Sequence, residues 1–175
     1  MTKLYWAYGS NLNIDHMAIR CPAAKKVRPL IVGDAALVFR HVADVTDRPG
    51  CVVPGGLWRI TRQCEASLDR YEGVASRLYL KRELEVKVDG VYEQVLFYQM
   101  RESRGVMPPG DHYLSTIAQG YKDFGLDLEI LDAYLQESWG EKKITEVLAR
   151  RRISRGEATL ARSIKLVKKS KSAKA

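Results

Sequence analysis

Two adjacent runs of alternating apolar and polar residues constrain the fold of this chain most strongly. In residues 78–88, leucines and valines alternate with Lys and Glu. Asp89-Gly90 follows, a pair typical of tight β-hairpin turns, and leads into a second β-rich run over residues 91–100. Because successive side chains of a strand point to opposite faces, the pattern predicts a half-buried antiparallel hairpin.

Shorter patterns predict the other elements of the N-terminal half. Residues 3–8 indicate a first strand, residues 13–20 a helix that ends at Cys21-Pro22, and residues 27–39 an interrupted strand. The clusters Asp47-Arg48-Pro49-Gly50 and Pro54-Gly55-Gly56 predict loops before a short strand over residues 57–60. Thr61 is the expected N-cap of a helix that Gly73 terminates.

Helical spacing returns in the C-terminal half, over residues 114–121 before Gly125 and again over residues 128–135. Helices and strands therefore do not alternate regularly along the chain. This order favours an α+β domain with a mostly antiparallel or mixed sheet.

The positive charge of the chain is concentrated at its C-terminus. Residues 142–175 hold 12 Lys or Arg against Glu146 and Glu157, whereas residues 1–141 carry a net charge of −2. We expect one domain over 1–141 and a basic tail over 142–175, with a helix at Ile144, Val147 and Leu148 before a flexible lysine-rich end. A merely solvated tail and weak contact with nucleic acid or an acidic partner both remain open.

Several kinds of protein are not indicated. No apolar run approaches the roughly 18 residues of a membrane span, and the N-terminus lacks a secretory signal pattern, so we expect a soluble, cytoplasmic protein that binds no membrane. Cys21, Cys51 and Cys64 have no C-x-x-C spacing and are interpreted as buried or idle thiols. The three histidines (His16, His41 and His112) show no metal-ligand spacing, so no metal site is expected.

Two short stretches could carry chemistry. In YGSNL, residues 8–12, a strand runs into small residues whose backbone amides could hold an anion, although such junctions are often merely structural. In LDRYEGV, residues 68–74, Glu72 stands at a helix C-terminus, where the dipole and any burial raise the pKa of a carboxylate. Glu72 is thus either a general base or a solvated glutamate before a Gly cap.

These two stretches, followed by PPGDHY and its helix, resemble in order and spacing the gamma-glutamylcyclotransferase family over about Lys3 to Leu135. The last stretch is most similar to the branch that acts on gamma-glutamyl amino acids. The resemblance implies a small mixed β-barrel flanked by helices, no metal or organic cofactor, and a homodimer, which is frequent in the family.

The resemblance also implies a reaction and roles for residues. The substrate's α-amine attacks its own γ-carbonyl, which releases 5-oxoproline and an amino acid or amine. Glu72 would be the acid/base catalyst, and no activated Ser or Cys is needed. Substrate contacts are expected from Tyr8, Gly9, Ser10, Asn11, Leu12, Tyr98 and Tyr113.

Three points stay open at this stage. Arg40 either faces the pocket, where it would pair with the substrate's carboxylate, or lies on the surface. Arg70 and Tyr71 flank the base at positions that vary in the family, so they could alter which leaving group is accepted. The alternative to an enzyme is a non-catalytic module that binds a small acidic ligand and docks to nucleic acid or an acidic partner through its basic tail.

Overall fold

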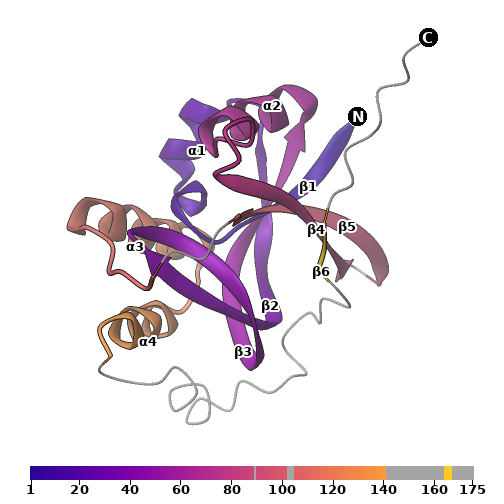
Figure 1. Cartoon of the computed structure of the whole chain (residues 1–175). Coiled ribbons are helices and arrows are strands. Elements are labelled where there is room, and N and C mark those ends of the chain that lie inside the picture. Colours follow the sequence, from indigo (N-terminus) through magenta and orange to yellow (C-terminus); the bar gives the residue numbers. More distant parts are fainter. Residues whose placement is uncertain (89, 102–104, 141–163, 167–175) are drawn as a thin grey trace.

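The computed structural model describes residues 1–88, 90–101, 105–140 and 164–166 (Figure 1). In chain order the elements are β1 (Thr2–Ala7), a 3-10 turn (Ser10–Leu12), α1 (Ile14–Arg20), β2 (Lys25–Arg40), β3 (Val42–Thr61), α2 (Arg62–Tyr71), β4 (Tyr79–Val88), β5 (Val91–Met100), α3 (Asp111–Phe124), α4 (Leu128–Ser138) and β6 (Ile164–Leu166). The predicted α+β class and the predicted β4–β5 hairpin are confirmed.

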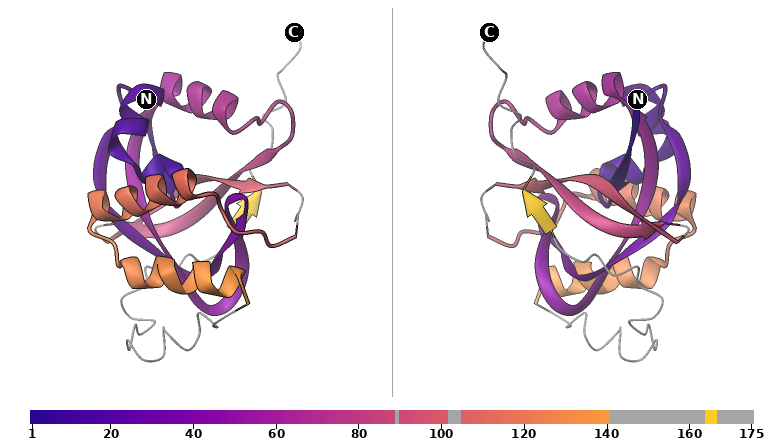
Figure 2. Two further views of the ribbon diagram at one scale, coloured as in Figure 1. Left: turned by 90° about the vertical axis from the view of Figure 1, so that its left-hand side faces the viewer. Right: turned by 90° about the vertical axis from the view of Figure 1, so that its right-hand side faces the viewer.

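The strands form one mixed sheet in the order β2-β3-β1-β5-β4-β6. The β1–β5 pairing is parallel and the other pairings are antiparallel. Figure 2 shows the long β2–β3 hairpin crossing the direction of the β4–β5 pair. Among the described strands β2 and β6 are free edges, so the sheet is mixed as expected but does not close into the barrel that the resemblance implied.

The β2–β3 hairpin corrects two predicted loops. Both clusters of Pro and Gly lie within β3, which runs from Val42 to Thr61, although residues 48–51 fall at a register shift in its pairing with β2. Pro54 pairs only with β2, at a point that β1 does not reach, so its missing N–H interrupts one side of the ladder alone. A Cβ on Gly55 would lie 2.0 Å from Nε1 of Trp6. Close packing of a neighbouring strand, rather than a turn, therefore requires this glycine.

The helix ends follow the sequence signals. The Thr61 hydroxyl caps α2 by accepting from the Cys64 N–H, and Gly73 turns the chain away with a φ of +62°. Gly125 ends α3 in the left-handed conformation. Helix α1 packs against α2, and α3 packs against α4 and against the 3-10 turn. Helices α1 and α3 thus both contact the 3-10 turn that follows β1.

Apolar side chains of the central strands and of α3 and α4 form one core. Trp6 of β1, Tyr121 of α3 and Tyr134 of α4 are almost fully buried in it. The three cysteines are free and buried, as predicted. Among the described helices none is long and apolar enough to cross a membrane.

Little of the basic tail lies within the described residues. Ile164–Leu166 form the short strand β6, which pairs with Arg82–Leu84 of β4 and was not predicted. The helix predicted from Ile144, Val147 and Leu148 and the lysine-rich end fall outside the described part of the chain.

Candidate active site

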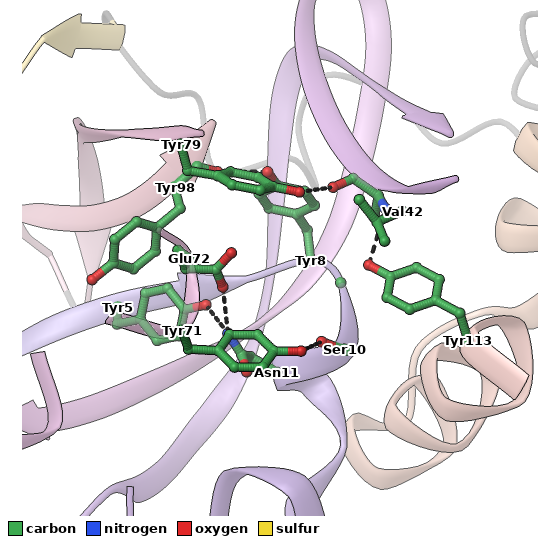
Figure 3. A pocket seen from close by; sticks show the side chains of 12 residues that line it. Tyr5, Tyr8, Ser10, Asn11, Val42, Tyr71, Glu72, Tyr79, Tyr98 and Tyr113 are labelled. Atoms are coloured by element: carbon green, nitrogen blue, oxygen red, sulfur yellow. Dashed lines mark hydrogen bonds between the residues drawn. The ribbon is translucent and has the colours of Figure 1, made fainter. Parts of the chain in front are cut away.

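A cavity of about 290 Å³ opens where β1, the start of β3, the end of α2, β4, β5 and α3 meet (Figure 3). Its wall combines one carboxylate with aromatic side chains and the loop after β1. The lining residues are Tyr5, Tyr8, Gly9, Ser10, Asn11, Val42, Ala43, Tyr71, Glu72, Tyr79, Tyr98 and Tyr113. The cavity therefore brings together the two stretches that the sequence singled out. They meet at Asn11 and Glu72, which are 61 residues apart in the sequence.

Glu72 is the acidic residue of this wall. It follows the last helical residue of α2, and its Oε1 accepts a hydrogen bond of 3.0 Å from Nδ2 of Asn11. Burial raises the pKa of Glu72 to about 7, against the opposing effects of the Arg20 charge and the Asn11 hydrogen bond. The sequence predicted this direction, and burial is its main cause. A carboxylate with this pKa exchanges protons readily at neutral pH.

The loop after β1 presents backbone N–H groups to the same cavity. Leu12 N–H donates to the Gly9 carbonyl (2.9 Å), and Asn13 N–H donates to the Ser10 carbonyl (3.2 Å). The N–H groups of Gly9, Ser10 and Asn11 precede these bonds, so the 3-10 turn itself offers them no acceptor. The Ser10 N–H donates to the Tyr113 hydroxyl, which also lines the cavity. This loop is therefore a candidate source of backbone donors to a ligand in the cavity.

Space around Gly9 is tight. A Cβ at this position would lie 3.2 Å from the Tyr113 hydroxyl and 3.3 Å from the Cβ of Ala43. Leu12 differs from the sequence expectation, because its side chain is fully buried and its N–H is already bonded. Leu12 thus anchors the loop in the core, and its side chain does not line the cavity.

Tyr98 and Tyr113 both line the cavity, as the resemblance implied. The Tyr98 hydroxyl donates to Oδ1 of Asp69 (2.7 Å), and the Tyr113 hydroxyl accepts from the Ala43 N–H (2.9 Å). Burial raises the pKa of each phenol well above its ordinary value, so both remain neutral. Tyr8 is held in the same wall by its hydrogen bond to the Tyr98 carbonyl.

Sequence reasoning missed part of this wall. Tyr5 was assigned only to a strand, although its hydroxyl accepts a hydrogen bond of 2.9 Å from Asn11. Tyr79 opens the alternating strand β4, and that alternation was the signal that could have placed it on one face. The suggestion that Arg40 faces the pocket is not supported, because its side chain forms a buried ion pair with Asp44 (3.0 Å) and does not line the cavity.

The site can supply a base and several hydrogen-bond donors. Among the described residues no group of three or more His, Cys, Asp or Glu side chains is placed to hold a metal ion. What the residues offer instead is proton transfer at Glu72 and stabilisation of negative charge at the amides of the loop.

Comparison with known proteins identifies the family. Residues 52–136, which include Glu72, Tyr98 and Tyr113, match the AIG2-like family. Gamma-glutamylcyclotransferase of Bos taurus is 32% identical over 139 residues, covering 72% of this chain and 73% of the bovine protein. The chain belongs to the gamma-glutamylcyclotransferase family. The Mus musculus gamma-glutamylcyclotransferase is 30% identical over 140 residues, covering 73% of this chain and 74% of the mouse protein.

Solved structures agree with this family assignment. A gamma-glutamyl cyclotransferase structure superimposes with a TM-score of 0.68 at 25% identity, over 86% of this chain and 99% of that one. An uncharacterized Homo sapiens protein gives a TM-score of 0.67 at 26% identity, over 85% of this chain and 98% of its own. The gamma-glutamylcyclotransferase fold is therefore confirmed for most of the chain.

Proposed function

We propose that this protein is a gamma-glutamylcyclotransferase that converts a gamma-glutamyl amino acid or amine into 5-oxoproline and the freed amino acid or amine. One observation carries the proposal. Glu72, with a pKa of about 7, lines the same cavity as Gly9, Ser10 and Asn11 of the loop after β1. The relatives that are 30% or more identical to this chain are named gamma-glutamylcyclotransferase, which supports the same activity.

The reaction moves two protons from the substrate's α-nitrogen to the departing nitrogen. The ionised Glu72 takes a proton from the substrate's α-ammonium group, and the free amine attacks the γ-carbonyl carbon. A C–N bond forms to close the five-membered ring, and the carbonyl oxygen becomes an oxyanion. Glu72 then returns its proton to the departing nitrogen as the original amide C–N bond breaks. The regenerated Glu72 carboxylate takes the second proton from the ring nitrogen, which leaves the neutral lactam, and passes that proton to the released amine. A pKa near 7 suits both roles at neutral pH.

The amides of Gly9, Ser10 and Asn11 are suited to hold the oxyanion. A donor of this type that is aimed at developing charge is worth roughly 2.7 to 4 kcal/mol in related hydrolytic sites. Gly9 lets the substrate approach the backbone closely, and the Ser10 and Asn11 side chains add polar contacts.

Tyr98 and Tyr113 would fold the glutamyl chain so that its amine reaches its own carbonyl. Holding nucleophile and electrophile together in one molecule is worth effective molarities of about 10⁵ to 10⁸ M. The reaction therefore proceeds without a covalent enzyme intermediate and without a cofactor in this proposal.

The setting of this activity is also a proposal. We place the protein in the cytoplasm, since its three cysteines are free thiols. Family resemblance favours a homodimer, and the charge of residues 142–175 favours weak contact with nucleic acid or an acidic partner.

The test is release of 5-oxoproline by the purified protein from three substrate classes: gamma-glutamyl amino acids, gamma-glutamyl amines and glutathione. The proposal predicts turnover of an amino acid or amine substrate, with kcat/KM rising with pH through about 7 as Glu72 ionises. Absence of 5-oxoproline from all three classes would reject the proposed function.

A further inference from the structure

Arg20 lies immediately behind the cavity. It is the last residue of α1, it is half-buried, and it does not line the cavity itself. Its guanidinium is nevertheless in contact with three residues that do line it, all through side-chain atoms. A residue in this place can act on the substrate only through its neighbours.

The contacts of Arg20 are short and directional. Nη1 donates to Oδ1 of Asn11 (2.6 Å) and, at 3.3 Å, to the Ser10 hydroxyl. Nη2 donates to the hydroxyl of Tyr71 (2.6 Å), and the guanidinium carbon lies 3.7 Å from the centroid of the Tyr71 ring. Arg20 therefore joins the loop after β1 to the end of α2, the two segments that supply Asn11 and Glu72.

These contacts determine how the Asn11 amide is oriented. An arginine has donors only, and an ionised carboxylate has acceptors only. The Asn11 oxygen must therefore face Arg20, which leaves its NH₂ group facing Glu72 (3.0 Å) and the Tyr5 hydroxyl (2.9 Å). The reverse orientation would place the amide oxygen against the carboxylate and the NH₂ group against the guanidinium.

We propose that Arg20 is a positioning residue, which holds the Asn11 side chain in the orientation that directs its NH₂ group at Glu72 and keeps Tyr71 in place as a wall of the cavity. This inference rests on the proposed function, since it assigns Glu72 the role of the base.

The charge of Arg20 has a second effect on the base. It lowers the pKa of Glu72 against the larger effect of burial, and the Asn11 hydrogen bond acts in the same direction. The other titratable groups that line the cavity are phenols, contributed by β1 and the loop after it, the end of α2, β4, β5 and α3. Tyr71 among them bonds to Arg20. Burial raises the pKa of the other five, so they stay neutral across the working range; they are Tyr5, Tyr8, Tyr79, Tyr98 and Tyr113.

The variants Arg20→Met and Arg20→Lys separate positioning from simple packing. Arg20→Met removes the charge and the hydrogen bonds, so the pKa of Glu72 should rise and the acid limb of kcat/KM should move to higher pH by at least half a unit. Arg20→Lys keeps the charge and should leave that limb near pH 7, with a smaller loss of rate. Arg59→Met is the matched control, because Arg59 is exposed on β3 and does not line the cavity.

A double-mutant cycle tests whether Arg20 acts through Asn11. At pH 9, where Glu72 is ionised in every variant, Arg20→Met and Asn11→Ala should each lower kcat by about ten-fold, and the double variant should be little worse than either. Multiplied losses in the double variant would contradict the inference.

A measurement without turnover keeps this inference distinct from the proposed function. Carboxyl ¹³C NMR of Glu72 in the substrate-free protein, assigned with Glu72→Gln, should show a higher pKa in Arg20→Met than in the wild type. An unchanged titration of Glu72 in a folded Arg20→Met variant would overturn the inference, whereas missing 5-oxoproline release by the wild type would overturn the proposed function.

Discussion

At the scale of single residues, the site depends on a carboxylate whose protonated form is favoured by folding. Burial raises the pKa of Glu72 from an ordinary value near 4.5 to about 7. Protonated Glu72 therefore favours the folded state. Its contribution to stability is fully present below about pH 4.5 and is lost as the pH rises through about 7. The ionised base that the reaction needs is therefore held against the preference of the fold.

Because ionised Glu72 destabilises the fold, we predict that Glu72→Gln stabilises the protein, and more so at higher pH. The free energy of unfolding of the variant relative to wild type should increase between pH 4 and pH 8 by up to about 3 kcal/mol, because glutamine cannot ionise. Urea denaturation at pH 4, 6 and 8 measures it. Glu129→Gln, on the exposed start of α4, is the control and should show no such trend. A difference independent of pH would contradict the prediction.

At the scale of elements, the loop after β1 is fixed by its contact with α3. A Cβ on Gly120 of α3 would lie 2.4 Å from the Cβ of Leu12 and 2.7 Å from the Asn13 nitrogen. Gly120→Ala must therefore push α3 away from the loop that presents the amides. We expect a loss of about 1 to 3 kcal/mol in stability and a lower kcat.

Gly110→Ala is the matched control for this prediction. Gly110 precedes the same helix, has a negative φ, and an added Cβ there meets no atom within 4 Å. Thermal unfolding and 5-oxoproline release are measured for both variants. Equal behaviour of the two alanine variants would show that the contact between α3 and the loop does not matter.

The same elements show which features of the fold and the site could be predicted from the sequence and which could not. Alternation gave the β4–β5 hairpin, and capping residues placed Glu72 at the end of α2. The Pro54-Gly55-Gly56 cluster was wrongly predicted as a loop, because Gly55 and Gly56 are required by contacts with Trp6 and Phe124 on other elements, which a local pattern does not reveal. The Asp47–Gly50 cluster instead lies at a register shift between β2 and β3. Arg20 was missed for the same reason, since its partners are 9 to 51 residues away in the chain.

At the scale of the whole molecule, the excess positive charge and the residues of the cavity lie in different parts of the chain. Every residue that lines the cavity lies within residues 1–141, whose net charge is −2, whereas the tail is strongly basic. We expect a chain ending at residue 141 to keep at least half of the wild-type kcat/KM. Its Tm should fall modestly, because β4 loses its pairing with β6 but keeps its pairing with β5.

The tail itself should account for any binding to polyanions. Retention of the full chain on immobilised DNA should weaken steeply with salt, since each neutralised phosphate contributes a slope of about 0.9 in log K against log salt. The shortened chain should not be retained. Loss of 5-oxoproline release on shortening would show instead that the tail completes the active site.

The central claim is that Glu72 moves the protons of a cyclisation reaction. The most direct measurement is the kcat for 5-oxoproline release by Glu72→Gln beside wild type and Glu129→Gln, with the fold of each checked by circular dichroism. We predict a folded Glu72→Gln protein whose kcat is lower by about 10² to 10⁴, and an unaltered Glu129→Gln. A folded Glu72→Gln protein that releases 5-oxoproline at close to the wild-type rate would contradict the account.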